Sequence, residues 1–140
     1  MLKSKSLRLV IDTNLWISFI ISNRFSQLDE ILLANNVKIL FSAELIAELE
    51  STIAKPKLKK YFSKNAFAEM LDVFDDYIEL ITVTSKVKIC RDANDDFLLA
   101  LAKDGKADYL LTGDNDLLEI GKFGGTKIMK IGDFLEKLKL

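Results

Sequence analysis

Acidic side chains follow short apolar runs at several widely separated positions of the chain. The first run, Leu9–Ile11, ends directly in Asp12, which is typical of a buried strand that delivers a carboxylate at its carboxyl end. In open α/β sheets, ligands bind at that end of the strands. Further acids follow a predicted strand or lie in the first half of a predicted helix, namely Glu48, Asp92, Asp95, Asp96, Asp114 and Asp116.

A group of carboxylates of this kind predicts a metal site, because the acids repel one another unless a cation lies among them. Ligand sets made only of oxygen select hard ions, here Mg²⁺ or Mn²⁺. Such ions activate water and neutralise a leaving oxygen, so the chemistry indicated is phosphodiester hydrolysis. The chain has no histidine, so we expect a carboxylate to accept the proton of the attacking water.

The residue types that are missing exclude other chemistries. Without histidine there is no Ser-His-Asp triad and no His-ligated zinc. The lone Cys90 excludes a disulfide and a cysteine metal cage, and it predicts a reducing, cytoplasmic compartment. The polar start of the chain is too short for a signal peptide, and no apolar run reaches the roughly 20 residues of a membrane helix.

The bulk composition predicts one folded domain over residues 1–140. The chain is 49% hydrophobic and 29% charged, which is typical of a globular domain with a real core. Its net charge of −1 gives no overall attraction to nucleic acid, so RNA binding would need a local patch.

The elements that must position the acids alternate along the chain, which predicts an α/β fold with a parallel sheet covered on both faces. Besides Leu9–Ile11, the predicted strands are Val37–Phe41, Ile78–Val83 with a continuation over Lys86–Arg91, Ala107–Thr112 and Lys127–Ile131. The first predicted helix has Asn14 as its N-cap, and the second covers Ser26–Asn35. Three more helices start at Ser42, Ser63 and Asp92. The last two cover Leu117–Gly121 and Asp133–Leu138.

Four stretches carry a resemblance to a known family. They are Val10–Asn14, Ser42–Leu49, Cys90–Ala102 and Ala107–Leu118. In this order they resemble a PIN-domain nuclease, and they are most similar to the branch of toxins from toxin–antitoxin pairs. The resemblance implies a three-layer α/β/α sandwich with a parallel, about five-stranded sheet. It also implies a Mg²⁺- or Mn²⁺-dependent endoribonuclease that cleaves single-stranded RNA, with a separate antitoxin protein as partner.

The resemblance also assigns roles to single residues. Asp12, Glu48, Asp95 and Asp114 match the family's catalytic metal acids, and Asp116 matches a nearby fifth ligand. Polar support around the metal falls to Thr13, Asn14 and Thr112. The chain departs from similar sequences at Ala93, where proline is frequent, and this departure touches no ligand.

Each acid also has a simpler interpretation. Asp12 could be only a helix cap, and Glu48 could face solvent. Asp96 could replace Asp95 as the third ligand. Asp114 and Asp116 could serve as turn or capping residues, since Gly, Asp and Asn favour turns.

Basic and aromatic residues give weaker predictions. Lys55, Lys57, Lys59 and Lys60 form a basic run that is either a solvated face or a grip for RNA phosphates, with Tyr61 or Phe62 able to stack a base. Trp16 and Phe19 are better explained as core or dimer contacts, and we expect a homodimer.

Two other classes of function compete with the nuclease. A non-catalytic interaction module could keep the same fold without turnover. A phosphoryl-transfer domain of the receiver type would need an acid after the third strand, and Ile81–Ser85 contains none. A dehalogenase-type phosphatase would need an acid two places after Asp12, where Asn14 stands.

Overall fold

A six-stranded sheet forms the middle layer of the structure, with strand order β3-β2-β1-β4-β6-β5. The computed structural model describes residues 7–22, 36–61 and 66–138. The strands are β1 (Leu7–Ile11), β2 (Val37–Phe41), β3 (Ile78–Leu80), β4 (Tyr109–Leu111), β5 (Lys122–Phe123) and β6 (Thr126–Met129). The predicted five-stranded parallel sheet is confirmed by β3, β2, β1, β4 and β6, and the short antiparallel β5 is an addition at the edge.

Strand β1 is central and pairs in parallel with β2 on one side and β4 on the other. Leu9, Val10 and Ile11 are fully buried, because helices cover both faces of the sheet. The register aligns Ile11 with Leu111. The residues that follow these two, one at the end of each strand, therefore emerge side by side at the carboxyl edge of the sheet.

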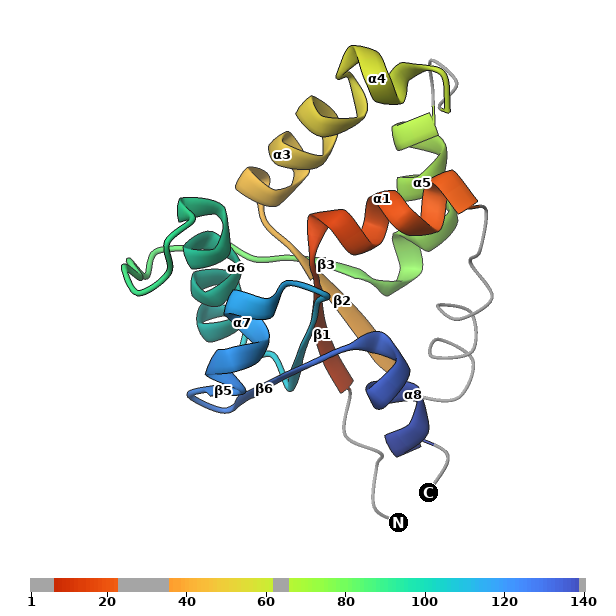
Figure 1. The fold of residues 1–140 in the computed structure, drawn as a ribbon. Helices are drawn as coiled ribbons and strands as arrows, with labels where there is room; N and C mark the ends of the chain where they lie inside the picture. Colours follow the sequence, from red (N-terminus) through yellow and green to blue (C-terminus); the bar gives the residue numbers. More distant parts are fainter. Residues whose placement is uncertain (1–6, 23–35, 62–65, 139–140) are drawn as a thin grey trace.

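Helices make up the two outer layers, and the predicted α/β/α sandwich is confirmed. They are α1 (Thr13–Ser22), α3 (Ala43–Ile53), α4 (Pro56–Lys59), α5 (Ala66–Phe74), α6 (Ala93–Asp104), α7 (Asn115–Ile120) and α8 (Ile131–Leu138), with a 3₁₀ turn, η1, at Asp75–Tyr77. Helices α6 and α7 lie on one side of the sheet, and α1, α5 and α8 lie on the other (Figure 1). None of the helices in the described part of the chain is long and apolar enough to cross a membrane.

Two of the predicted helices fall wholly or partly outside the described residues, namely Ser26–Asn35 and the start at Ser63. The N-cap predicted at Ser42 is confirmed, since its hydroxyl accepts a hydrogen bond from the Leu45 N–H at 3.1 Å. The N-cap predicted at Asn14 is wrong. Helix α1 begins one residue earlier, and the Asn14 N–H donates to Oδ1 of Asp12 at 3.2 Å, so Asp12 takes the capping position.

The strand predicted over Ile78–Val83 is too long, because β3 ends at Leu80, and its predicted continuation over Lys86–Arg91 is not a strand. Residues 81–91, here called the strap, instead run alongside α6. One carboxylate oxygen of Asp104 accepts from the N–H groups of Thr84 and Ser85 at 2.6 and 2.8 Å. At the other end of α6, Oδ1 of Asp96 accepts from the N–H groups of Ile89 and Cys90 at 3.1 and 2.9 Å. Two aspartates of α6 therefore satisfy backbone groups that a neighbouring strand would otherwise have paired.

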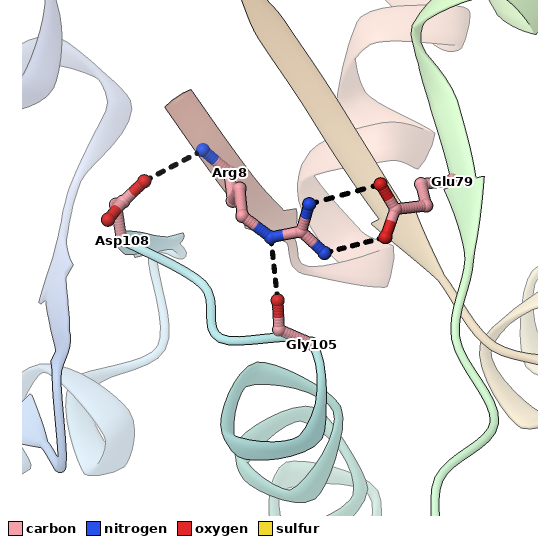
Figure 2. A network of polar contacts seen from close by, with 4 residues as sticks. All are labelled: Arg8, Glu79, Gly105 and Asp108. Carbon is pink, nitrogen blue, oxygen red and sulfur yellow. Dashed lines mark hydrogen bonds and ion pairs between the residues drawn. The ribbon is translucent and has the colours of Figure 1, made fainter. Parts of the chain in front are cut away.

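At the amino edge of the sheet, Arg8 of β1 ties several elements together (Figure 2). Its guanidinium forms a two-pronged ion pair with Glu79 of β3, with N···O distances of 3.0 and 2.7 Å. Its Nε donates to the Gly105 carbonyl at 2.7 Å, and its backbone N–H donates to Asp108 at 2.9 Å. This network lies at the opposite end of β1 from Asp12, so its role is to hold β1, β3 and the end of α6 together.

Candidate metal centre at the carboxyl edge of the sheet

Asp12 occupies the end of β1, where it is buried with 6% of its surface exposed. The Thr112 hydroxyl donates to Oδ2 of Asp12 at 2.6 Å, and the Asn14 N–H donates to Oδ1. Both carboxylate oxygens are therefore held by donors from fixed elements. Asp12 does cap α1, as its simpler interpretation required, and the capping geometry also fixes its carboxylate against the end of β4.

Asp114 follows β4 and is joined to Asp12 through Thr112. The Asp114 N–H donates to the Thr112 hydroxyl oxygen at 3.0 Å. Oδ1 of Asp114 accepts from the Asp116 N–H at 2.8 Å and so caps α7. Asp114 is thus a capping residue, as its simpler interpretation required, and its side chain also lies near Asp95 of α6.

The first turn of α6 separates its three acids into different roles. Asp92 is the N-cap and accepts from the Asn94 N–H at 2.9 Å. Asp96 binds the backbone of the strap, as described above. Asp95 is buried with 6% exposed, and one of its carboxylate oxygens lies within 4.8 Å of oxygens of Asp114 and Asp116. Of the two alternatives left open by the sequence, the structure thus brings Asp95 and not Asp96 into the acid cluster.

Glu48 of α3 lies near Asp12 and does not belong to the group of Asp95, Asp114 and Asp116. The Thr13 hydroxyl donates to its Oε2 at 3.2 Å, and the side chain is half-buried rather than turned to solvent. Burial is the main cause that raises the pKa of Glu48. The Thr13 hydrogen bond opposes that effect, and the nearby charges of Asp12 and Asp92 add to it.

The electrostatics of the site are those of acids crowded together. Burial above all, and then the negative charges of Asp114, Asp92, Asp12 and Asp116, raise the pKa of Asp95 to about 6. The ion pair of Arg8 with Glu79 lies at the amino edge of the sheet, so it does not neutralise these acids. The donor atoms are all oxygens, which fits a hard divalent cation better than zinc or copper.

The predicted basic residues lie mostly away from the acids. Lys55, Lys57, Lys59 and Lys60 are exposed on and beside α4, beyond the far end of α3, and Lys60 lies over the Tyr61 ring at 5.1 Å. Lys55 is near enough to lower the pKa of Glu48 slightly against the other effects. The remaining three lysines are not brought to the acids.

Trp16 belongs to the core. It is 1% exposed and packs its ring against Phe19, Phe41 and Phe74 at centroid distances of 5.6 to 6.1 Å. The core interpretation of Trp16 and Phe19 is therefore confirmed, and neither ring can stack a base at the surface.

Arg91 lies beside the cluster, and sequence reasoning gave it no role. It lines a shallow pocket together with Cys90, Asp116 and Glu119. The signal in the sequence was its position next to Asp92, at the start of the acid-rich helix. Burial chiefly raises the pKa of the Cys90 thiol to about 12, so the cysteine stays protonated and is no nucleophile.

Comparisons with known proteins agree with this geometry. The sequence model of the PIN domain family matches residues 8–116, a range that contains all five predicted metal acids. A curated relative, the uncharacterized protein MJ1680 of Methanocaldococcus jannaschii, is 26% identical over 117 residues, which cover 81% of this chain and 75% of that protein.

A structural relative has the same fold at lower sequence identity. It is a chain in the crystal structure of VapBC2 from Rickettsia felis bound to a DNA fragment from their promoter. The superposition has a TM-score of 0.58 with 19% identity and covers 87% of this chain and 97% of that chain. At this level of identity, the likeness establishes the fold.

Proposed function

This chain belongs to the PIN domain family, and on that premise we propose that it is a Mg²⁺- or Mn²⁺-dependent endoribonuclease that hydrolyses phosphodiester bonds of single-stranded RNA. The observation that carries the proposal is the convergence of Asp95, Asp114 and Asp116, with Asp12 held beside them by Thr112. Acids from the ends of two strands and the start of a helix repel one another when they meet in this way, and a cation bound among them would offset that repulsion.

In the proposed site, Asp95, Asp114 and Asp116 hold the metal together with Asp12 and Glu48. A divalent ion bound there supplies Lewis-acid stabilisation of the phosphodiester and lowers the pKa of water. The chain's own groups do the rest. Thr112 and the Asn14 N–H fix the carboxylate of Asp12, and Thr13 orients Glu48. In the absence of histidine, one of these carboxylates accepts the proton of the attacking water.

We assign the protein to the toxin half of a toxin–antitoxin pair. Support comes from the resemblance of its motifs to that branch and from the fold shared with a chain of VapBC2, which was crystallised with promoter DNA. Its partner would be a separate antitoxin chain, and we expect the nuclease itself to form a two-fold dimer.

The test is cleavage of end-labelled single-stranded RNA by the purified protein. We expect cleavage with Mn²⁺ or Mg²⁺ and none with excess EDTA. Asp12→Asn and Asp114→Asn should each lower the rate by at least about 100-fold, since even residues that only support metal ligands cost 10- to 100-fold. Asp72→Asn, which removes an exposed acid of α5, is the matched control and should cleave like the wild type. Undiminished cleavage by Asp12→Asn, or cleavage in EDTA, would reject the proposal.

A further inference from the structure

A groove opens between α3 and α6, beside Glu48. Its floor is apolar and consists of Leu45 from α3 and of Leu98 and Leu101 from α6. Glu48 forms part of its wall, so the groove and the proposed metal site share a side chain. A ligand in the groove would therefore contact Glu48, one of the acids of the proposed metal site.

Phe97 also lines this groove, and its ring is exposed at 53%. Phe97 lies one helical turn after Asn94, whose amide can both donate and accept hydrogen bonds, and both side chains border the groove. Among the described residues, the other exposed large aromatic is Tyr61, which lies past α4 and carries Lys60 over its ring. The sheet and core give Phe97 no packing role that would explain a half-exposed ring at this position.

The dimensions of the groove limit its occupant. Its enclosed volume is about 70 Å³, well below that of small-ligand sites. A planar group can therefore insert only an edge, and most of it would lie over the mouth of the groove against the exposed ring of Phe97. An apolar floor, an aromatic ring at the rim and an amide beside it form the usual environment of an unstacked base.

We propose that one unpaired nucleobase of the RNA lies over the mouth of this groove, stacked on Phe97, next to the phosphate that lies over the acid cluster. The inference rests on the proposed ribonuclease function and deepens it. The base is drawn from a single strand, because a base within a duplex is paired and stacked and cannot stack on Phe97. Phe97 is thus a substrate-positioning residue and takes no part in the chemical step.

The experiment is a double-substitution cycle between Phe97 and the RNA. In a short single-stranded RNA that the wild type cleaves at one site, each base near that site is replaced in turn by an abasic residue. We expect one abasic position to lower kcat/KM about tenfold, the usual size of a stacking contribution. Phe97→Leu should lower kcat/KM on intact RNA by a similar factor, and the two changes together should cost no more than either alone. Phe97→Tyr should cleave like the wild type.

Two controls distinguish the loss of the contact between Phe97 and the base from a general loss of activity. Leu80→Ala removes another exposed apolar side chain, 67% exposed at the edge strand β3, and should leave kcat/KM unchanged. The same cycle is also measured on equilibrium RNA binding in the Asp12→Asn background by fluorescence anisotropy, a readout that needs no turnover.

The outcomes separate the two proposals. Equal kcat/KM for Phe97→Leu and the wild type, or losses that simply multiply with the abasic substitution, would overturn the base site while leaving the nuclease intact. This is also the result expected if the groove receives a side chain of a protein partner instead. A wild type that cleaves no RNA would reject the nuclease, and the binding cycle would then decide the base site by itself.

Discussion

One hydroxyl group links the two strand ends of the acid cluster at the level of single residues. Thr112 is 1% exposed, donates to Asp12 and accepts from the Asp114 N–H. Each role fixes the direction of a carboxylate that repulsion would otherwise push away. We therefore expect Thr112→Val to lower the rate of RNA cleavage by about 10- to 100-fold, as for other groups that orient metal ligands.

Thr112→Ser is the matched control, because it keeps the hydroxyl and loses only a methyl group. It should retain most of the wild-type rate in the same cleavage assay. Equal losses in the two variants would show that packing of the methyl group, and not the hydrogen bonds, explains the importance of Thr112.

The crowding of acids predicts a pH dependence of stability in the metal-free protein. The pKa of Asp95 is raised from 3.8 to about 6, so the folded state binds a proton more tightly than the unfolded state. Stability is therefore expected to fall as pH rises from about 4 to above 6. Asp95→Asn removes this penalty and should be about 1 kcal/mol more stable than the wild type at neutral pH, after allowance for solvent screening.

Urea unfolding in EDTA measures this difference directly. The advantage of Asp95→Asn should disappear below about pH 4, where Asp95 is protonated in both states. A variant that is less stable than the wild type at neutral pH would contradict the interpretation of Asp95 as a repelled, buried acid.

The choice between Asp95 and Asp96 was within reach of the sequence. Asp95 shares a helical face with Leu98, Leu99 and Ala102, all of which are buried, whereas Asp96 is turned by about 100° from it. What the sequence did not reveal is the use of Asp96, because no local pattern records that backbone N–H groups of the strap bind a side chain of α6.

At the scale of elements, the strap explains why one strand prediction was wrong. From Ile81 to Lys88, the side chains alternate between half-buried and exposed, as those of an edge strand would. Pairing, however, depends on a neighbouring strand, and here two aspartates of α6 take that place. The buried strands β1, β2 and β4 could be predicted because a continuous apolar run indicates burial on both faces of a sheet. The register of their pairing could not be predicted, because it depends on tertiary contacts that no local pattern contains.

The junction of α6 with the sheet depends on a close approach at Gly105. A Cβ at this position would lie 2.6 Å from Cδ1 of Leu40 and 3.0 Å from the Leu101 carbonyl oxygen. Leu40 is fully buried and has little freedom to move. We expect Gly105→Ala to lower the free energy of unfolding by about 1–3 kcal/mol, as overpacked cores do.

Gly132→Ala is the matched control for this measurement, since nothing lies within 4 Å of the added Cβ and the residue is in α8. Urea unfolding should show the control to be neutral or slightly more stable. A neutral Gly105→Ala would mean that α6 can move away from β2 without cost.

At the scale of the whole molecule, a net charge of −1 and an acid cluster at the sheet edge give RNA no electrostatic reason to bind. The proposed metal offsets part of the negative charge at that edge and gives a phosphate a cation to bind. This makes the convergence of the acids on a cation the central claim, because both the nuclease and the nucleobase groove depend on it.

Calorimetric titration of Mn²⁺ into the metal-free protein tests this claim most directly. The wild type and Asp72→Asn should bind Mn²⁺ with equal affinity, and Asp114→Asn should bind at least about tenfold more weakly, because it loses one charged oxygen ligand. No binding to the wild type, or equal binding to all three proteins, would contradict the assignment of these acids to a metal centre.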